Sequence, residues 1–252
     1  MPPITGDTML TRLAFAALLL AAAAFSARAA QVTVGGAAIA LPPPSGFCEL
    51  SPTEPSDKRM ITTLTDLLEK SGNKLLAMST HCQQLRDWRT GKRQLLDDYA
   101  QYQTPIGSMD KPPSETVAQT CSTLRQEGNK ILENQMPDIK ARVESTLSKI
   151  KMNEARFLGV LAEDSNACYA GLVQKIHTEA GTDKTQITVF AITIIKEKSV
   201  FSYRFAVYHS AQTADMLLGR VRNEVTSLMA ANGIGGPVDR GNSGNSLPSS
   251  RK

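Results

Sequence analysis

Two consecutive stretches, QITVFAITII (residues 186–195) and FSYRFAVY (residues 201–208), decide how this chain folds. β-Branched and aromatic side chains dominate both, a composition typical of strands because such side chains fit a pleated sheet. In the second stretch Phe201, Tyr203 and Phe205 recur with a period of two. This alternation predicts a strand with one face buried and the other nearer water.

The preceding residues extend this pattern into a sheet. Apolar runs at 157–161 and 168–176 predict two more strands, separated by the turn formers of residues 163–166. Short connections between successive strands favour antiparallel pairing. The sequence therefore predicts a four-stranded antiparallel meander in this part of the chain.

A helix is predicted directly after the meander, because both of its ends carry signals. Ser210 is a suitable N-cap residue and Gly233 a suitable stop. Leu217, Val221 and Leu228 share one face of this helix. A meander cannot bury both of its faces alone, so this apolar stripe is expected to cover one of them.

The first 29 residues have the three parts of an export signal. Arg12 supplies the positive charge, residues 13–25 are uninterrupted apolar sequence, and Ala27-Arg28-Ala29 is a small-residue cleavage site. The apolar part is too short for an ordinary membrane-spanning helix. The sequence thus predicts a periplasmic or extracellular protein with no transmembrane segment after cleavage.

Charge and cysteine content limit the functions that the protein can have. A formal net charge of +4 over 252 residues, with no cluster of cations among aromatic residues, argues against nucleic-acid binding. The four cysteines predict two disulfides in an oxidising compartment, with three pairings open. Sequence order alone favours Cys48–Cys82 and Cys121–Cys168. No C-x-x-C is present, so a thioredoxin-type redox role is not expected.

The remaining elements are less sharply defined. In chain order they are a hairpin at 31–41, a helix capped by Ser56, a strand at 74–80, a strand or helix at 95–102, and a helical insertion at about 114–151. Pro137 suits the first turn of the second of two helices in that insertion. Residues 30–232 are expected to form one domain, and residues 233–252 a disordered tail.

The segment AAIALPPPSGF (37–47), the aromatic strand at 201–208 and its terminal helix together resemble the PsbP/DcrB-like group of exported proteins. The resemblance implies an α/β/α sandwich, that is, an α+β fold with a mostly antiparallel central sheet flanked by helices. It also implies an accessory or binding role without enzymatic activity. The long helical insertion and the four cysteines depart from the common pattern of that group.

Candidate catalytic residues are few. His81, His177 and His209 have no metal-ligand spacing, and no G-x-S-x-G is present. His177 and His209 are expected near the ends of adjacent meander strands, where exposed histidines are common. The sequence therefore predicts no catalytic, metal or cofactor site. The alternative is a hydrolase whose site is built from His177, His209 and Glu163.

One candidate surface remains. Trp88 is expected in a polar loop with Arg86 and Arg89, where it could recognise an anionic partner or could fold its ring onto the core. The functional hypothesis is a non-enzymatic module that binds an envelope protein or a small ligand. A purely structural envelope protein is the other alternative, besides the hydrolase.

Overall fold

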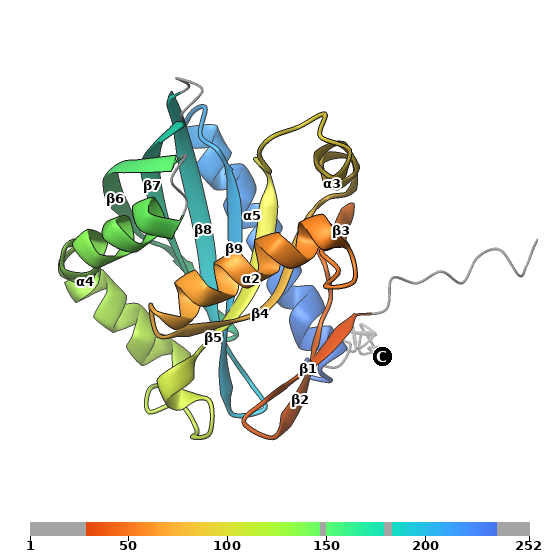
Figure 1. The fold of residues 1–252 in the computed structure, drawn as a ribbon. Coiled ribbons are helices and arrows are strands. Elements are labelled where there is room, and N and C mark those ends of the chain that lie inside the picture. Colours follow the sequence, from red (N-terminus) through yellow and green to blue (C-terminus); the bar gives the residue numbers. More distant parts are fainter. Residues whose placement is uncertain (1–28, 147–149, 179–182, 236–252) are drawn as a thin grey trace, which may run out of the picture.

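The computed structural model describes residues 29–146, 150–178 and 183–235 (Figure 1). Residues 1–28 of the predicted export signal lie outside the described residues, and so does most of the predicted tail. The described part is an α+β fold in which helices pack on a seven-stranded antiparallel sheet of order β3-β4-β5-β9-β8-β7-β6. A separate hairpin, β1–β2, completes it. The predicted fold class is confirmed.

The strands of the large sheet are long at one side and short at the other. They are β3 (Phe47–Glu49), β4 (Asn73–His81), β5 (Tyr99–Pro105), β6 (Ile150–Glu163), β7 (Ala167–Thr178), β8 (Asp183–Ile195) and β9 (Lys198–Val207). The last four form the predicted antiparallel meander. Its first strand begins at Ile150, seven residues before the predicted start at Phe157, inside the span expected to be helical.

Four α-helices and the hairpin cover the sheet. The helices are α2 (Pro55–Glu69), α3 (Cys82–Arg89), α4 (Val117–Thr146) and α5 (Ala211–Ala231), and a short 3-10 turn, η2, spans Ile106–Ser108. Figure 1 shows α2 and α4 on one side of the sheet and α5 on the other. We call these the front face and the α5 face. The layers are therefore helix, sheet, helix.

The hairpin of β1 (Ala30–Val34) and β2 (Ala37–Leu41) turns at Gly35-Gly36, as predicted. Both glycines have positive φ, +49° and +81°. A Cβ at Gly35 would also lie 1.8 Å from the backbone oxygen of Met109, so only glycine fits there. The side chain of Asn232 then bonds both backbone groups of Ala40, which fixes the hairpin against the end of α5.

The N-terminus of α5 was predicted correctly. Ser210 is its N-cap, and the Thr213 hydroxyl accepts hydrogen bonds from the backbone N–H groups of His209 and Ser210 at 3.3 Å. The helix buries its predicted stripe, including Leu217 and Leu228, in the main core. That core also receives Val34 and Ile39 from the hairpin.

Two helices differ from their predicted form. α3 carries Trp88, which was expected in a loop, and α4 is one helix through Pro137 rather than two. Because proline has no N–H, the helix loses one backbone hydrogen bond there, and its axis changes direction in Figure 1. α4 packs on β6, where Gly128 lets the helix approach the Phe157 ring so closely that a Cβ would lie 2.2 Å from it.

Strand β9 holds the least expected feature of the sheet. Its aromatic residues Phe201, Tyr203 and Phe205 lie on the front face and are only partly buried. The alternate residues Ser202 and Arg204 face α5 and are 1% and 3% exposed. The alternation correctly identified the strand, but the polar face of that strand is the one that is fully buried.

Candidate functional site

Trp88, Arg86 and Arg89 all lie on α3, and each has a different environment. The Trp88 ring is partly buried and packs on a small apolar cluster that contains Met78 and Leu85. Arg86 is exposed and donates to the side chain of Gln83 on its own helix. A partner surface at Trp88 therefore stays a prediction, with much of the ring committed to packing.

Arg89 has a structural partner. Its guanidinium donates from Nε to Asp57 Oδ1 at 3.0 Å and from Nη2 to Asp57 Oδ2, while Ser51 N–H donates to Oδ2 at 2.9 Å. Burial alone would raise the pKa of Asp57, but these donors together hold it below its usual value. This ion pair joins the start of α2 to the end of α3.

The residues of the alternative hydrolase site are not brought together. Glu163 pairs with Cys168 at one end of β7, whereas His177 lies nine residues further along, roughly 30 Å away at about 3.3 Å per residue. His177 Nδ1 contacts Asp183 Oδ1 at 2.6 Å, and both groups are exposed. His209 follows β9 at the same end of the sheet as His177. The two histidines were expected on adjacent strands, but β8 lies between β7 and β9.

The cysteines form the two disulfides that sequence order favoured, Cys48–Cys82 and Cys121–Cys168. The second is completely buried and joins α4 to β7. The first joins β3 to the start of α3 and is only partly buried. Two disulfides fit a protein that folds in an oxidising environment.

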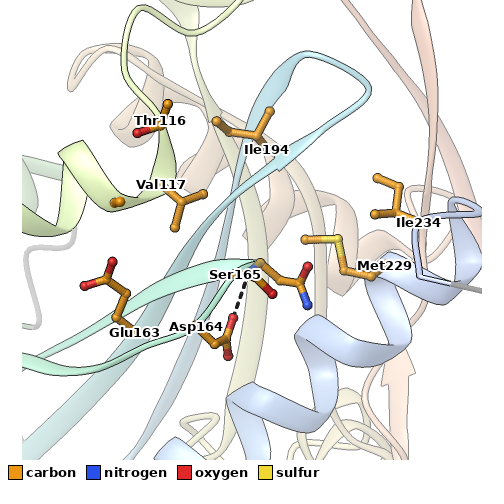
Figure 2. Close-up of a pocket in the computed structure, with 10 residues that line it drawn as sticks. Thr116, Val117, Glu163, Asp164, Ser165, Ile194, Met229 and Ile234 are labelled. Carbon is orange, nitrogen blue, oxygen red and sulfur yellow. Dashed lines mark hydrogen bonds between the residues drawn. The ribbon is translucent and has the colours of Figure 1, made fainter. Parts of the chain in front are cut away.

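A pocket that the sequence did not predict lies where four segments meet (Figure 2). It is open to solvent and has a volume of about 800 Å³. It is lined by the start of α4 (Thr116, Val117, Ala118), the β6–β7 turn (Glu163, Asp164, Ser165, Asn166), Ile194 of β8, and Met229 and Ile234 at the end of α5. We call it the turn pocket.

The β6–β7 turn that forms one wall is held by Asp164. Its Oδ1 accepts hydrogen bonds from the backbone N–H groups of Asn166 and Ala167, both at 2.9 Å, and its Oδ2 accepts from the Tyr169 hydroxyl at 2.9 Å. Burial and the nearby Asp164 raise the pKa of Tyr169, so this phenol remains a neutral donor. The turn is therefore fixed before anything binds.

The opposite wall is also fixed. At the start of α4, Thr116 N–H donates to Gln119 Oε1 at 2.8 Å, and Gln119 N–H donates to Thr116 Oγ1 at 3.3 Å. This reciprocal pair is a capping box. One helical turn further on, Cys121 is bonded to Cys168, which follows the β6–β7 turn in sequence. The disulfide thus connects the two walls covalently.

The sequence predicted a turn at residues 163–166 but no pocket beside it. The pocket could not be predicted because it depends on tertiary contacts. Val117, Ile194 and Met229 come from elements far apart in the sequence, and their convergence depends on where α4 and α5 pack on the sheet. No local pattern could have shown it.

An ionic cluster around the buried side chains of Arg204 and Glu224 lies on the α5 face. Arg204 Nη1 donates to Glu224 Oε1 at 2.6 Å, and its Nε donates to Asp98 Oδ1 at 3.0 Å. Arg220 lies 3.6 Å from the other oxygen of Asp98. Burial raises the pKa of Glu224 to about 7, and its Oε2 is buried without a hydrogen-bond partner among the described residues.

Within the described ranges, no three His, Cys, Asp or Glu side chains come together in a group that could hold a metal ion. In the same part of the chain, no helix is long and apolar enough to cross a membrane.

The chain matches no known protein family and no curated protein. Two solved structures are similar over 81% of this chain and 92% of their own, each with 10% sequence identity. One is a mutant of the protein Mog1, with a TM-score of 0.32, and the other is the Saccharomyces cerevisiae Ran-binding protein Mog1p, with a TM-score of 0.29. Similarity at this level assigns no function to the chain.

Proposed function

We propose that this protein is an exported, non-enzymatic binding module, and that its turn pocket holds a segment of a partner protein. The observation that carries the proposal is the pocket itself, which has a volume of about 800 Å³, is open to solvent and is lined by both apolar side chains and polar groups. Binding sites are commonly concave and apolar with a few placed polar groups. The resemblance to accessory proteins of the PsbP/DcrB-like group is part of this proposal.

Rigidity of the walls supports a binding role. The capping box at Thr116, the hydrogen bonds of Asp164 and the Cys121–Cys168 disulfide hold both sides of the pocket in place. A site that is ordered before binding loses less conformational entropy when it binds. The wide separation of His177 and Glu163 favours a binding role over the hydrolase alternative.

The test is capture of partners from the native envelope fraction, with the pocket filled by mutation. Ala118 is exposed and lines the pocket, so Ala118→Trp should occupy it with little effect on folding. Gln126→Trp, an exposed position on α4 that does not line the pocket, is the matched control.

We expect a partner that is retained by wild type and by Gln126→Trp and lost with Ala118→Trp. Trp88→Ala run in parallel tests the surface expected from sequence. Equal capture by wild type and Ala118→Trp would refute the pocket, and loss with Trp88→Ala alone would place binding on α3 instead.

A further inference from the structure

In the part of the chain that the structure describes, no helix or strand covers the apolar side chains of the turn pocket. Val117, Ile194 and Ile234 are partly buried and line the pocket together with Met229, which is 5% exposed. Figure 2 shows Val117 and Ile194 on one side of the space and Met229 and Ile234 on another. An aliphatic side chain placed between them would be removed from water on several sides, which is favourable in proportion to the apolar area buried.

The charged groups of the pocket have one sign. Its ten lining residues include Glu163 and Asp164 but no Lys, Arg or His. Glu163 already has a cation, since Arg125 Nη2 lies 2.7 Å from its Oε2. Asp164 takes part in none of the ion pairs formed among the described residues. Its hydrogen-bond donors, two backbone N–H groups and the Tyr169 hydroxyl, are all neutral.

From these observations we infer that the turn pocket is specific for a partner segment that carries a Lys or Arg next to an aliphatic residue. The aliphatic side chain packs between Val117, Ile194 and Met229, and the cation lies beside the carboxylate of Asp164. The inference rests on the proposed function, because it names the chemistry of the partner at the same site. Charge complementarity at an exposed carboxylate contributes chiefly to specificity.

The experiment uses small probes that separate apolar from charged contributions. The mature protein with both disulfides intact would be labelled with ¹³C at its Met and Ile methyl groups, and the shifts of Met229 and Ile194 followed. The probes are butylguanidinium, 1-butanol and butyrate, which share a four-carbon chain and differ in charge. At low ionic strength we expect butylguanidinium to bind about fivefold more tightly than butanol, the effect of one ion pair at about 4 Å in water. Butyrate should bind most weakly.

Asp164→Asn is the informative variant. The Asn side-chain oxygen can still accept the backbone hydrogen bonds of the turn, so the fold is retained while the charge is removed. We expect it to bind butylguanidinium and butanol equally. Glu163→Gln, which changes a carboxylate already paired with Arg125, is the matched control and should keep most of the preference.

Three results would overturn the inference. One is equal binding of the three probes by wild type. Another is an unchanged preference for butylguanidinium in Asp164→Asn. A third is a preference that appears only when residues 236–252 are deleted, which would make the basic end of this chain, and not a partner, the occupant. In each case, loss of partner capture by Ala118→Trp would still support the proposed function, so the two can fail separately.

Discussion

The two faces of the central sheet are stabilised by different means. On the α5 face, seventeen buried apolar residues form one continuous core with α5 and the β1–β2 hairpin. On the front face the apolar cluster under α2 and α3 has four. Both disulfides join front-face elements, α3 and α4, to sheet strands, and the Asp57–Arg89 ion pair joins α2 to α3. The front face, with the smaller apolar cluster, thus carries both disulfides, whereas the α5 face carries the buried Arg204–Glu224 ion pair beside its larger core.

The difference matters for function because the turn pocket lies where the two faces meet. Its α5 side is held by Met229, which belongs to the large core. Its α4 side is held by the Cys121–Cys168 disulfide. A site between a well-packed core and a cross-linked helix can keep its shape although few apolar contacts support the helix.

The largest expected effect tests the cross-links. Replacing Cys121 and Cys168 together by Ala removes a disulfide between residues that are 47 apart in sequence. Because the unfolded chain then gains conformational entropy, the free energy of unfolding should fall by about 4 kcal/mol. The 34-residue separation of Cys48–Cys82 predicts nearly the same. Urea unfolding of each double variant measures both. A loss below about 1 kcal/mol for either would show that apolar packing alone holds the front face.

The next largest loss of stability is expected when a side chain in the large core is shortened. Leu228 is completely buried, so Leu228→Ala should lower the free energy of unfolding by about 3 kcal/mol through lost burial and the cavity left behind. Met216 on the same helix is 46% exposed, and Met216→Ala should change it by less than about 0.5 kcal/mol. Equal losses at the two positions would mean that the buried stripe of α5 has been assigned to the wrong side.

The free energy of unfolding should also depend on pH, by an amount of similar size. Burial raises the pKa of Glu224 to about 7 from an ordinary 4.5, so the folded protein holds this proton more tightly than the unfolded chain. The resulting stabilisation is complete below pH 4.5 and is lost as the pH rises through 7. The shift corresponds to about 3 kcal/mol.

Urea unfolding between pH 4.5 and 8 should show this fall in wild type, and Glu224→Gln should remove it. Asp215→Asn, an exposed acid on the same helix, is the control. The opposite slope, with wild type gaining stability relative to Glu224→Gln as the pH rises, would mean that Arg204 outweighs burial at this carboxylate.

The same contrast between faces explains what the sequence could predict. The four meander strands, the cap at Ser210 and the disulfide pairing depend on local patterns and sequence order, and all are present in the structure, although the first strand begins seven residues earlier than predicted. The burial of Arg204 in place of its aromatic neighbours could not be predicted. Alternation shows which side chains share a face, but the coverage of that face depends on helices from elsewhere in the chain.

The candidate site was missed for a related reason. Trp88 was predicted as a partner surface because it is a lone Trp among cations in the sequence. In the structure its ring packs partly on Met78 and Leu85. The turn pocket needs residues from α4, β8 and α5 together. The sequence predicted the β6–β7 turn but not the apolar residues that α4 and α5 bring to it.

The smallest expected effect compares one glycine on a helix of each face. On α5, Gly219 is exposed and a Cβ there would meet nothing within 4 Å. Gly219→Ala should therefore stabilise the protein by up to about 1 kcal/mol, the difference in helix propensity. On α4, the same change at Gly128 gains that propensity but forces the Phe157 ring aside, because the new Cβ would lie 2.2 Å from it.

Overpacking typically costs about 1–3 kcal/mol, so Gly128→Ala should have a net destabilising effect of about 1 kcal/mol. The double variant Gly128→Ala with Phe157→Leu, which removes the ring, should recover part of this loss. Urea midpoints of the three variants decide the matter. If Gly128→Ala were as stabilising as Gly219→Ala, α4 would have room to move away from β6. The wall of the turn pocket would then depend on the Cys121–Cys168 disulfide alone.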